Sequence, residues 1–302
     1  MSLMRQIVLA EPGDFREEQG AAPVTHPGEA LVRIHRVGVC GTDLHAFAGR
    51  QPFFSYPRIL GHELGVEVVK APANDRNIRA GDRCAVEPYI NCGDCHACRL
   101  GRPNCCERIR VLGVHTDGGM RPLLNVPVRL LHKSERLALD QLALVETLGI
   151  GAHAVRRANL QAGEDALVIG AGPIGLAVVQ FAMAAGANVR VLERLESRRN
   201  FVARLGVEVI SEPGDRLADA VFDATGNPAA MEAGFERVAH AGRLVFVGLV
   251  QGKLSFEDPL FYAQPGGAGC FVDPGDGDGA GYVRYENGHC DTAPIDWAAE
   301  PR

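Results

Sequence analysis

The order of apolar and polar positions divides the chain into three stretches of different character. Residues 4–150 carry short β-branched runs broken by Gly and Pro, as in EALVRIHRVGVC, GVEVVKAP, DRCAVEP and LLNVPVRLL. Short runs of this kind between turn residues are typical of β-strands. We therefore predict a compact, mostly β domain over residues 4–150.

The second stretch, residues 151–264, alternates between two kinds of apolar segment. ALVIGAGPIG indicates a strand that enters a glycine turn, and LAVVQFAMAAGA continues as a helix with an apolar face. Three further strands (NVRVLE, EVIS and AVFDATG), a last strand (RLVFVGL) and two helices (SRRNFVARLG and PAAMEAGFERVA) follow. Strands that alternate with helices predict a parallel, doubly wound sheet, so the fold class is α/β.

The third stretch, residues 265–302, is unlike both. It holds eight glycines, four prolines and no leucine. Such a segment offers little apolar surface to offset the entropy lost on ordering. We expect an irregular tail without helical or strand periodicity.

Composition narrows the functional classes. The chain has 302 residues, 46% hydrophobic and 23% charged, which favours a globular protein of two domains. A net charge of −6 argues against a basic face that would bind nucleic acid. The sequence contains no run of eighteen apolar residues, so we predict no membrane span. The nine cysteines, most at metal spacing, fit a reducing compartment, so we expect the cytoplasm.

Four of the cysteines form a run with the spacing of a metal site. Cys92, Cys95, Cys98 and Cys106 follow the pattern C-x2-C-x2-C-x7-C. Tetrahedral zinc needs four ligands around one point, and a set of four thiolates leaves no position for water. The alternative is a set of buried or disulfide-bonded cysteines, but polar neighbours such as Asp94 argue against core packing. The run predicts a structural zinc site.

A second pattern predicts a dinucleotide site. Gly170, Gly172 and Gly175 form G-x-G-x-x-G, with Ile174 inside the motif, between a predicted strand and helix. The glycines permit a tight turn, close approach of a pyrophosphate and close helix–strand packing. Glu193 ends the next strand eighteen residues after Gly175, where a carboxylate accepts hydrogen bonds from ribose and repels a 2′-phosphate. NAD is therefore expected in preference to NADP.

Arg198, on the helix after Glu193, is a candidate neighbour of the adenine ribose. A solvated helix charge is the alternative for this residue. Arg194 beside Glu193 weakens the argument against NADP.

Beyond the cysteine run, GVCGTDLHAFAG, ILGHELG and ALVETLGIGAHAV resemble motifs of the zinc-containing medium-chain alcohol and polyol dehydrogenases. The resemblance implies a GroES-like catalytic domain followed by a Rossmann domain. It also implies a catalytic zinc with Cys40 and His62 as ligands. The third ligand is Glu63 or Glu146, and the two glutamates could exchange.

The resemblance further implies the reaction. Zinc lowers the pKa of a bound alcohol, and hydride then passes to NAD. Thr42 occupies the place of a hydroxyl that passes the proton onward, and His45 could carry it to solvent, or be a plain surface histidine. GRQPFFSYPRILGHE and NCCERIRVLGVHTDGG resemble the branch with sorbitol, threonine and L-galactonate dehydrogenases, so the expected substrate is a polyol or sugar acid.

The chain departs from the family in two places. After residue 264 the resemblance stops, and the tail replaces elements through which relatives commonly dimerise, so we expect weak association instead of a tight dimer. EPGDRLAD alone connects the strands EVIS and AVFDATG, which is short for a parallel crossover and predicts a missing helix. One alternative is therefore a folded but impaired NAD- and zinc-binding protein. Another is a zinc-free quinone reductase of the same superfamily, which the two predicted zinc sites disfavour.

Overall fold

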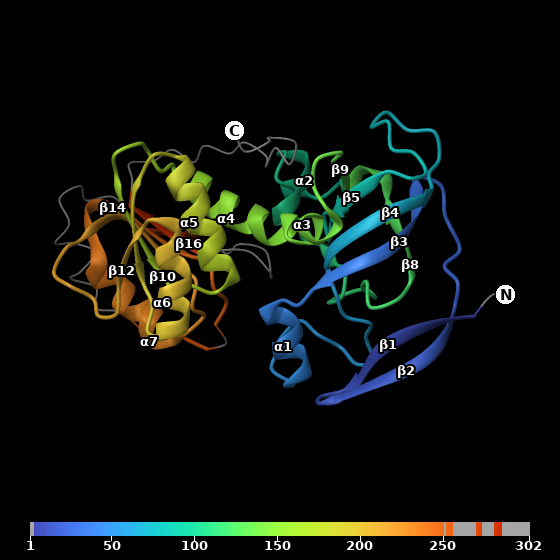
Figure 1. Ribbon diagram of the computed structural model, residues 1–302, viewed down its shortest axis with the longest axis horizontal. Helices are drawn as coiled ribbons and strands as arrows, with labels where there is room; N and C mark the ends of the chain where they lie inside the picture. Colours follow the sequence, from blue (N-terminus) through green and yellow to red (C-terminus); the bar gives the residue numbers. More distant parts are fainter. Residues whose placement is uncertain (1–2, 251, 256–269, 274–280, 286–302) are drawn as a thin grey trace. The chain divides into compact units, whose positions relative to one another are not determined.

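A computed structural model describes residues 3–250, 252–255, 270–273 and 281–285 of the chain, the last two segments by their backbone alone (Figure 1). The chain divides into two compact units, Met1–Glu146 and Thr147–Arg302. The sequence pattern put this division at residue 150 and set residues 265–302 apart as a third segment. In the described residues no helix combines the length and the apolar character needed to cross a membrane.

Unit 1 is mostly β, as predicted. Its strands are β1 (Leu3–Glu11), β2 (Asp14–Ala21), β3 (Glu29–Gly38), β4 (Glu63–Lys70), β5 (Arg83–Val86), β6 (Tyr89–Ile90), β7 (Arg110–Val111), β8 (Leu123–Pro127) and β9 (Leu131–Lys133). Its helices are short: α1 (Gly41–Phe47), α2 (His96–Arg99), α3 (Leu139–Ala143) and the 3₁₀ turns η1 (Pro103–Cys105) and η2 (Val128–Leu130).

An antiparallel sheet with the strand order β8-β3-β4-β5-β9 forms the centre of unit 1. Alternate residues of β3, such as Ala30 and Val32, are fully buried and pack with Val66 and Val68 of β4. α3 lies against β4 because Gly65 has no side chain: a Cβ there would come within 1.9 Å of the Leu139 carbonyl oxygen. This sheet carries the ends of β3 and β4, where the candidate site lies.

Unit 2 has the predicted alternation of strands and helices. Its helices are α4 (Val145–Arg157, which begins in unit 1), α5 (Pro173–Ala184), α6 (Glu196–Val202) and α7 (Pro228–Gly234), with 3₁₀ turns η3 (Ala203–Leu205) and η4 (Phe235–Arg237). Its strands are β10 (Asp165–Ile169), β11 (Asn188–Leu192), β12 (Glu208–Ile210), β13 (Ala218–Asp223), β14 (Val238–Phe246), β15 (Cys270–Asp273) and β16 (Gly281–Tyr285).

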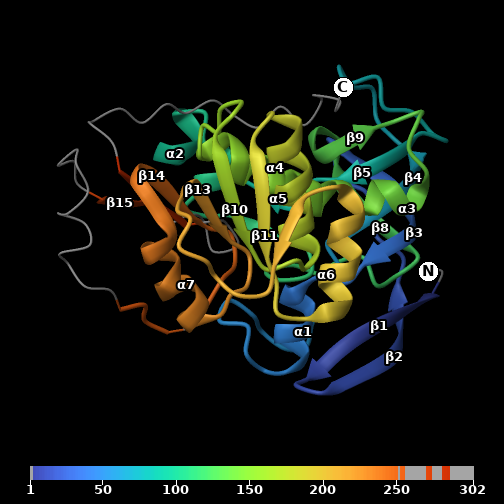
Figure 2. The ribbon, with the colours of Figure 1, turned by 60° about the vertical axis from the view of Figure 1, so that its left-hand side comes forward.

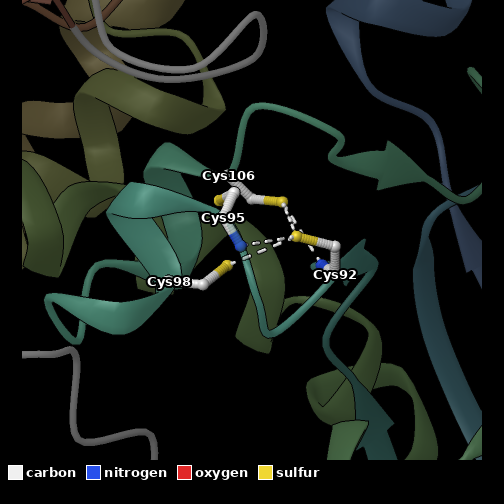
Figure 3. A group of neighbouring side chains, drawn as sticks. All are labelled: Cys92, Cys95, Cys98 and Cys106. Atoms are coloured by element: carbon white, nitrogen blue, oxygen red, sulfur yellow. Dashed lines mark hydrogen bonds between the residues drawn. The ribbon is translucent and has the colours of Figure 1, made fainter.

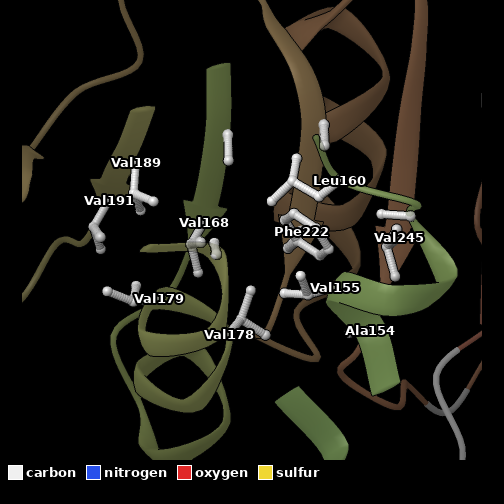
Figure 4. Close-up of a cluster of buried hydrophobic side chains, with 14 of the residues drawn as sticks. Ala154, Val155, Leu160, Val168, Val178, Val179, Val189, Val191, Phe222 and Val245 are labelled. Carbon is white, nitrogen blue, oxygen red and sulfur yellow. The ribbon is translucent and has the colours of Figure 1, made fainter. Parts of the chain in front are cut away.

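The strand order in unit 2 is β12-β11-β10-β13-β14-β16-β15, and β10 to β14 run parallel. Helices cover both faces of this sheet, as Figures 1 and 2 show. On β10, Val168 packs with Val178 of α5 and Val155 of α4 (Figure 4). Its neighbour Leu167 packs on the opposite face with Met231 of α7. The doubly wound α/β sheet is confirmed.

The connection between β12 and β13 contains no helix in the structure, as its length predicted. These strands lie three positions apart in the sheet, and residues 211–217 cross the gap. The Arg216 guanidinium binds the Asp165 carboxylate at 2.6 Å, and the Arg190 guanidinium donates to the Arg216 carbonyl oxygen at 3.0 Å. Side chains of the sheet thus hold the short crossover in place.

The prediction that residues 265–302 form an irregular tail needs a correction. Residues 270–273 and 281–285 form strands, and β16 pairs antiparallel with β14. Backbone hydrogen bonds make this ladder, and the segments CFVD and GYVRY hold enough aromatic and β-branched residues to favour it. The expectation of weak association depended on a bare β14 edge, which β16 covers. The rest of 265–302, including most of the stretch that we predicted to be irregular, lies outside the described residues.

Candidate functional site

The four cysteines of the metal-spaced run converge in unit 1. Their sulfur atoms all lie within 4.8 Å of one another (Figure 3). Cys95 is the N-cap residue directly before α2, and Cys106 directly follows η1, so two short helical turns bring the thiols around one point. Four thiolates at these distances form a closed, tetrahedral type of donor set, which suits structural zinc.

Hydrogen-bond donors surround these sulfur atoms. The backbone N–H of Cys92 donates to the Cys106 sulfur at 3.2 Å, and that of Cys95 donates to the Cys92 sulfur at 3.4 Å. Burial raises the pKa of the Cys106 thiol to about 11, while a hydrogen bond from the Cys98 backbone lowers the pKa of Cys95 to about 6. Donors of this kind stabilise negative charge on sulfur, which a metal-binding thiolate carries.

A second group of side chains that could hold a metal ion lies where β3 ends and β4 begins. Ligand atoms of Cys40, His62 and Glu63 lie within 4.8 Å of one another. Cys40 precedes α1, and Glu63 is the first residue of β4, so adjoining strands bring together residues that are distant in sequence. A thiol, an imidazole and a carboxylate are three protein ligands of the type found in catalytic zinc sites, which keep a further position open.

The charge around His62 also suits a cation. Burial lowers the pKa of this imidazole, but the Cys40 thiol, Glu146 and Asp43 together raise the pKa to about 10. The Nδ1 atom of His62 lies 3.9 Å from Asp43 Oδ1, and neither atom has a hydrogen-bond partner in the described structure. Buried carboxylates such as Asp43 and Glu146 favour a positive charge at this place.

Glu146 lies near this group but outside it. The residue is buried, with 5% of its surface exposed, and its charge acts on His62. Tyr89 donates its hydroxyl hydrogen to Glu146 Oε1 at 2.6 Å. Of the two glutamates left open by the sequence, the structure thus groups Glu63 with Cys40 and His62, and it gives Glu146 a tyrosine partner.

Helix α1 carries both residues of the expected proton path. Thr42 is partly buried and His45 is exposed, and a spacing of three residues puts them on the same side of the helix. Asp43, between them, accepts a hydrogen bond from the Cys40 backbone N–H at 2.9 Å. This bond fixes the start of α1 beside Cys40.

The glycine motif has the geometry that a dinucleotide needs. Gly170 has a φ of +94°, which favours glycine, and the motif follows β10 directly. A Cβ on Gly175 would lie 1.9 Å from the Gly170 carbonyl oxygen, so the helix can approach the strand only with glycine there. At Gly172 the nearest atom to a Cβ is Arg198 Nη1 at 3.9 Å, which leaves the backbone accessible. Ile174, partly buried, is in the first turn of α5.

Glu193 contacts the glycine turn itself. Its Oε2 accepts from the Ala171 backbone N–H at 2.8 Å, and its Oε1 accepts from that of Leu195 at 2.8 Å. Burial acts to raise the pKa of Glu193, but these hydrogen bonds hold it below its ordinary value. Arg198 lies 3.9 Å from Glu193 Oε2. The carboxylate is therefore ionised and placed at the turn where the sequence predicted the cofactor.

The sequence analysis missed three residues at these sites. The sequence could have indicated Asp43, because this residue stands at the third helical position after Cys40, where its side chain can cap the start of the helix. Gly38 faces Glu63 across β3 and β4, which only the strand register reveals. Tyr89 precedes the cysteine run and has no pattern that links it with Glu146, which is distant in sequence.

Comparisons with known proteins cover both units of the chain. Residues 26–136 match the family described as "Alcohol dehydrogenase GroES-like domain", and residues 173–265 match "Zinc-binding dehydrogenase". An L-galactonate-5-dehydrogenase of Escherichia coli is 43% identical over 87% of this chain and 82% of its own length. An L-threonine 3-dehydrogenase of Pyrococcus furiosus is 34% identical over 78% of this chain and 72% of its own length.

Solved structures of dehydrogenases share the fold. A putative zinc-binding dehydrogenase of Sinorhizobium meliloti, bound to NADP, has a TM-score of 0.81 at 28% identity and covers 87% of this chain and 82% of its own. An alcohol dehydrogenase of Escherichia coli in complex with NADH has the same score, identity and coverage. With the matched regions and the 43% relative, these likenesses extend over both units. The chain therefore belongs to the zinc-dependent alcohol and polyol dehydrogenase family and is an oxidoreductase.

Proposed function

We propose that this chain oxidises a secondary alcohol of a polyol or sugar acid and transfers the hydride to NAD. The observation that carries the proposal is the group formed by Cys40, His62 and Glu63, whose ligand atoms lie within 4.8 Å of one another. The accessible glycine turn at Gly172 supports a dinucleotide in unit 2. The proposed organisation is a catalytic domain over residues 4–150 and a dinucleotide-binding domain over 151–264.

Cys40, His62 and Glu63 hold the catalytic zinc in this proposal. When bound, zinc acts as a Lewis acid that lowers the pKa of a coordinated alcohol. Asp43 orients the site by holding the Cys40 backbone and by facing His62 Nδ1. Glu146 does not coordinate the zinc in this proposal but can exchange with Glu63 as a ligand. Its charge acts on His62, which supports this role.

Thr42 and His45 serve the proton released from the alcohol. The Thr42 hydroxyl can accept a proton and donate one, and it is partly buried beside Cys40. His45 is exposed on the same side of α1, and a histidine exchanges protons near neutral pH. The pair thus joins a half-buried hydroxyl to solvent.

The dinucleotide binds at the turn made by Gly170, Gly172 and Gly175. The first turn of α5 offers free backbone N–H groups to the pyrophosphate, and a helix N-terminus favours an anion. Glu193 accepts hydrogen bonds from the ribose hydroxyls and disfavours a 2′-phosphate by its charge. Arg198, which lies 3.9 Å from Glu193 Oε2, would then be a neighbour of the adenine ribose. The nicotinamide supplies the hydride acceptor.

The cysteine lobe, defined by Cys92, Cys95, Cys98 and Cys106, holds a second zinc with a structural role. All four ligand positions are taken by sulfur, so the site leaves no place for substrate. Zinc in such a lobe contributes to folding.

The substrate class rests on the relatives. One of them is named an L-galactonate-5-dehydrogenase and another a 2-dehydro-3-deoxy-L-galactonate 5-dehydrogenase. Both names describe oxidation of a hydroxyl on a sugar acid. We therefore infer that a small sugar acid or related polyol is preferred over a simple alcohol.

A substrate screen tests the proposal. The purified chain is incubated with NAD and a set of aldonic acids, polyols, L-threonine and ethanol, and reduced cofactor is followed by absorbance. We expect the largest kcat/KM with an aldonic acid or polyol and no turnover in Cys40→Ser. Thr42→Val, which keeps the shape but removes the hydroxyl, should lower kcat about a hundredfold. Equal activity of the parent and Cys40→Ser would refute the catalytic assignment.

A further inference from the structure

We propose that Asn91 is a positioning residue that holds the Cys98 sulfur in place for zinc in the cysteine lobe. The proposal rests on the proposed function, because it concerns the structural zinc that we assign to this lobe. Asn91 stands directly before the cysteine run and is not one of the four ligands. Its side-chain nitrogen lies 3.6 Å from the Cys98 sulfur, to which it donates a hydrogen bond.

The Cys98 sulfur differs from the other three sulfur atoms in the kind of donor that it has. The Cys106 sulfur accepts from the Cys92 backbone N–H at 3.2 Å, and the Cys92 sulfur accepts from the Cys95 backbone N–H at 3.4 Å. The Cys95 sulfur in turn accepts from the Cys98 backbone. Apart from the ligand thiols, the Asn91 amide is the one donor to the Cys98 sulfur among the residues that the structure describes. One ligand of the lobe thus depends on a side chain.

A donor of this kind matters because cysteine binds zinc as a thiolate. An N–H group that points at the sulfur stabilises its negative charge and fixes the direction of the side chain. Residues that hold a metal ligand in this way commonly change metal affinity by about tenfold to a hundredfold when they are replaced. The Asn91 amide therefore strengthens the lobe without touching the metal.

Asn91 is itself anchored to the rest of unit 1. It directly follows β6, in which Ile90 pairs with Arg110 of β7. The Asn91 carbonyl oxygen accepts from the Arg129 guanidinium at 3.2 Å, and Arg129 belongs to η2. η2 connects β8 with β9, and both strands belong to the five-stranded sheet. The side chain of Asn91 extends this anchor to Cys98.

Cys98 needs an anchor because the helix that carries it is short. It lies in α2, which spans only His96–Arg99. A helix of four residues is not stable by itself, so α2 depends on contacts with its surroundings. We infer that the Asn91 amide holds Cys98 near the other thiols before zinc arrives and slows the opening of the lobe afterwards.

The test compares two asparagines of the same lobe. Asn91 donates to a ligand sulfur, whereas Asn104 donates at 3.5 Å to the sulfur of Cys105, which lies outside the group of four. Both asparagines are half-buried. Asn91→Asp and Asn104→Asp keep the shape of the side chain, replace the donating NH₂ group with oxygen and add the same charge. Asn91→Leu and Asn104→Leu remove the donor and add no charge.

Release of zinc to a chelating dye is the first measurement, made on the full-length, zinc-loaded proteins. The release phase that remains in Cys40→Ser, which lacks a ligand of the second site, belongs to the cysteine lobe. We expect this phase to be about tenfold faster in Asn91→Leu than in the parent and faster still in Asn91→Asp. Both Asn104 variants should release this zinc at the rate of the parent.

A spectrum shows whether the effect passes through the sulfur. Protein produced with cobalt in the lobe absorbs in the near ultraviolet through charge transfer from thiolate to metal. Loss of a donor raises the energy of the sulfur electrons, so this band should move to longer wavelength in Asn91→Leu. In Asn104→Leu the band should stay in place. A variant that only loosens the packing of the lobe does not produce this pair of results.

Three results would overturn the proposal. They are release at the parent rate in both Asn91 variants, equal acceleration in the Asn104 variants, and a cobalt band that does not move in Asn91→Leu. If Asn91→Leu does not fold, the release rate of Asn91→Asp against that of Asn104→Asp decides. Parent protein that carries no zinc in the lobe would instead refute the structural zinc site itself, and that result is distinct because it needs no variant at residue 91.

Discussion

Gly38 and Glu63 face each other where β3 meets β4, and the glutamate side chain occupies the space that a side chain at Gly38 would fill. A Cβ built on Gly38 would lie 2.0 Å from Glu63 Oε2 and 2.8 Å from Glu63 Cβ. Real contacts are never this short, so the carboxylate keeps its place beside Cys40 and His62 only while residue 38 is glycine.

We predict that Gly38→Ala moves Glu63 and weakens zinc binding at the second site at least tenfold. The methyl group forces the Glu63 side chain away, whereas the sheet hydrogen bonds can remain. Zinc content after dialysis against a chelator measures the effect. Gly41→Ala is the control, because a Cβ at Gly41 meets nothing within 4 Å. Full zinc retention in Gly38→Ala would mean that Glu63 is no ligand.

Cofactor preference should follow the charge of Glu193. We predict that NAD binds at least tenfold more tightly than NADP, a difference of about 1.4 kcal/mol. Glu193→Ala should narrow the gap, measured by equilibrium titration with both cofactors. Because Glu193 also holds the Ala171 and Leu195 N–H groups, Glu193→Gln is the better variant. It removes the charge and keeps an acceptor for the turn. Equal affinities in the parent protein would overturn the assignment.

The two zinc sites should fail in different ways. Cys95→Ser removes one ligand of the closed cysteine lobe and should cost folding or solubility, since binding at such a site is coupled to folding. Cys40→Ser should remain folded and bind NAD without turnover. Metal analysis, melting and cofactor titration separate the two results.

Cys105 provides the control for that pair. It adjoins Cys106 in sequence but lies outside the group of four sulfur atoms. Cys105→Ser should therefore keep both zinc ions and full activity. Loss of a zinc ion in this variant would show that the lobe uses a different set of thiols.

Stability should fall with acid partly through His153. Burial, with Arg156 and Arg157 nearby, lowers the pKa of this imidazole from 6.5 to about 4. In the unfolded chain this imidazole binds a proton below pH 6.5, whereas in the folded chain it binds the proton only below about pH 4. The contribution of His153 to the free energy of unfolding is therefore fully present above pH 6.5. As the pH falls from 6.5 to about 4, this contribution is lost, which lowers the free energy of unfolding by on the order of 2–3 kcal/mol.

Urea unfolding at pH 7 and pH 4.5 measures the effect. His153→Gln has no titrating ring, so its loss between the two pH values should be smaller than in the parent. Acid release of zinc lowers the free energy of unfolding of both proteins equally. Subtracting the loss in His153→Gln from the loss in the parent therefore cancels this effect. Equal losses would show that His153 takes up its proton in the folded state.

The sequence predicted the parts that local pattern determines. The glycine turn follows β10 as expected, because a strand, a turn with Gly170 at positive φ and a helix are all specified within a few residues. The cysteine lobe is equally local. The relation of Glu146 to Tyr89 depends on how distant segments pack, and no spacing reveals it. β16 was missed for another reason, since a ladder uses backbone groups that composition does not report.

The short crossover between β12 and β13 has a consequence for how the second unit opens. On the face covered by α7, Leu192 and Ile210 are only partly buried, because no helix from residues 211–217 lies over them. Local unfolding begins where few apolar side chains are covered. Amide hydrogens of β12 should therefore exchange with solvent well before those of β10. The β12 edge of the sheet is then the first part of this sheet to open locally. Bound dinucleotide should slow that exchange.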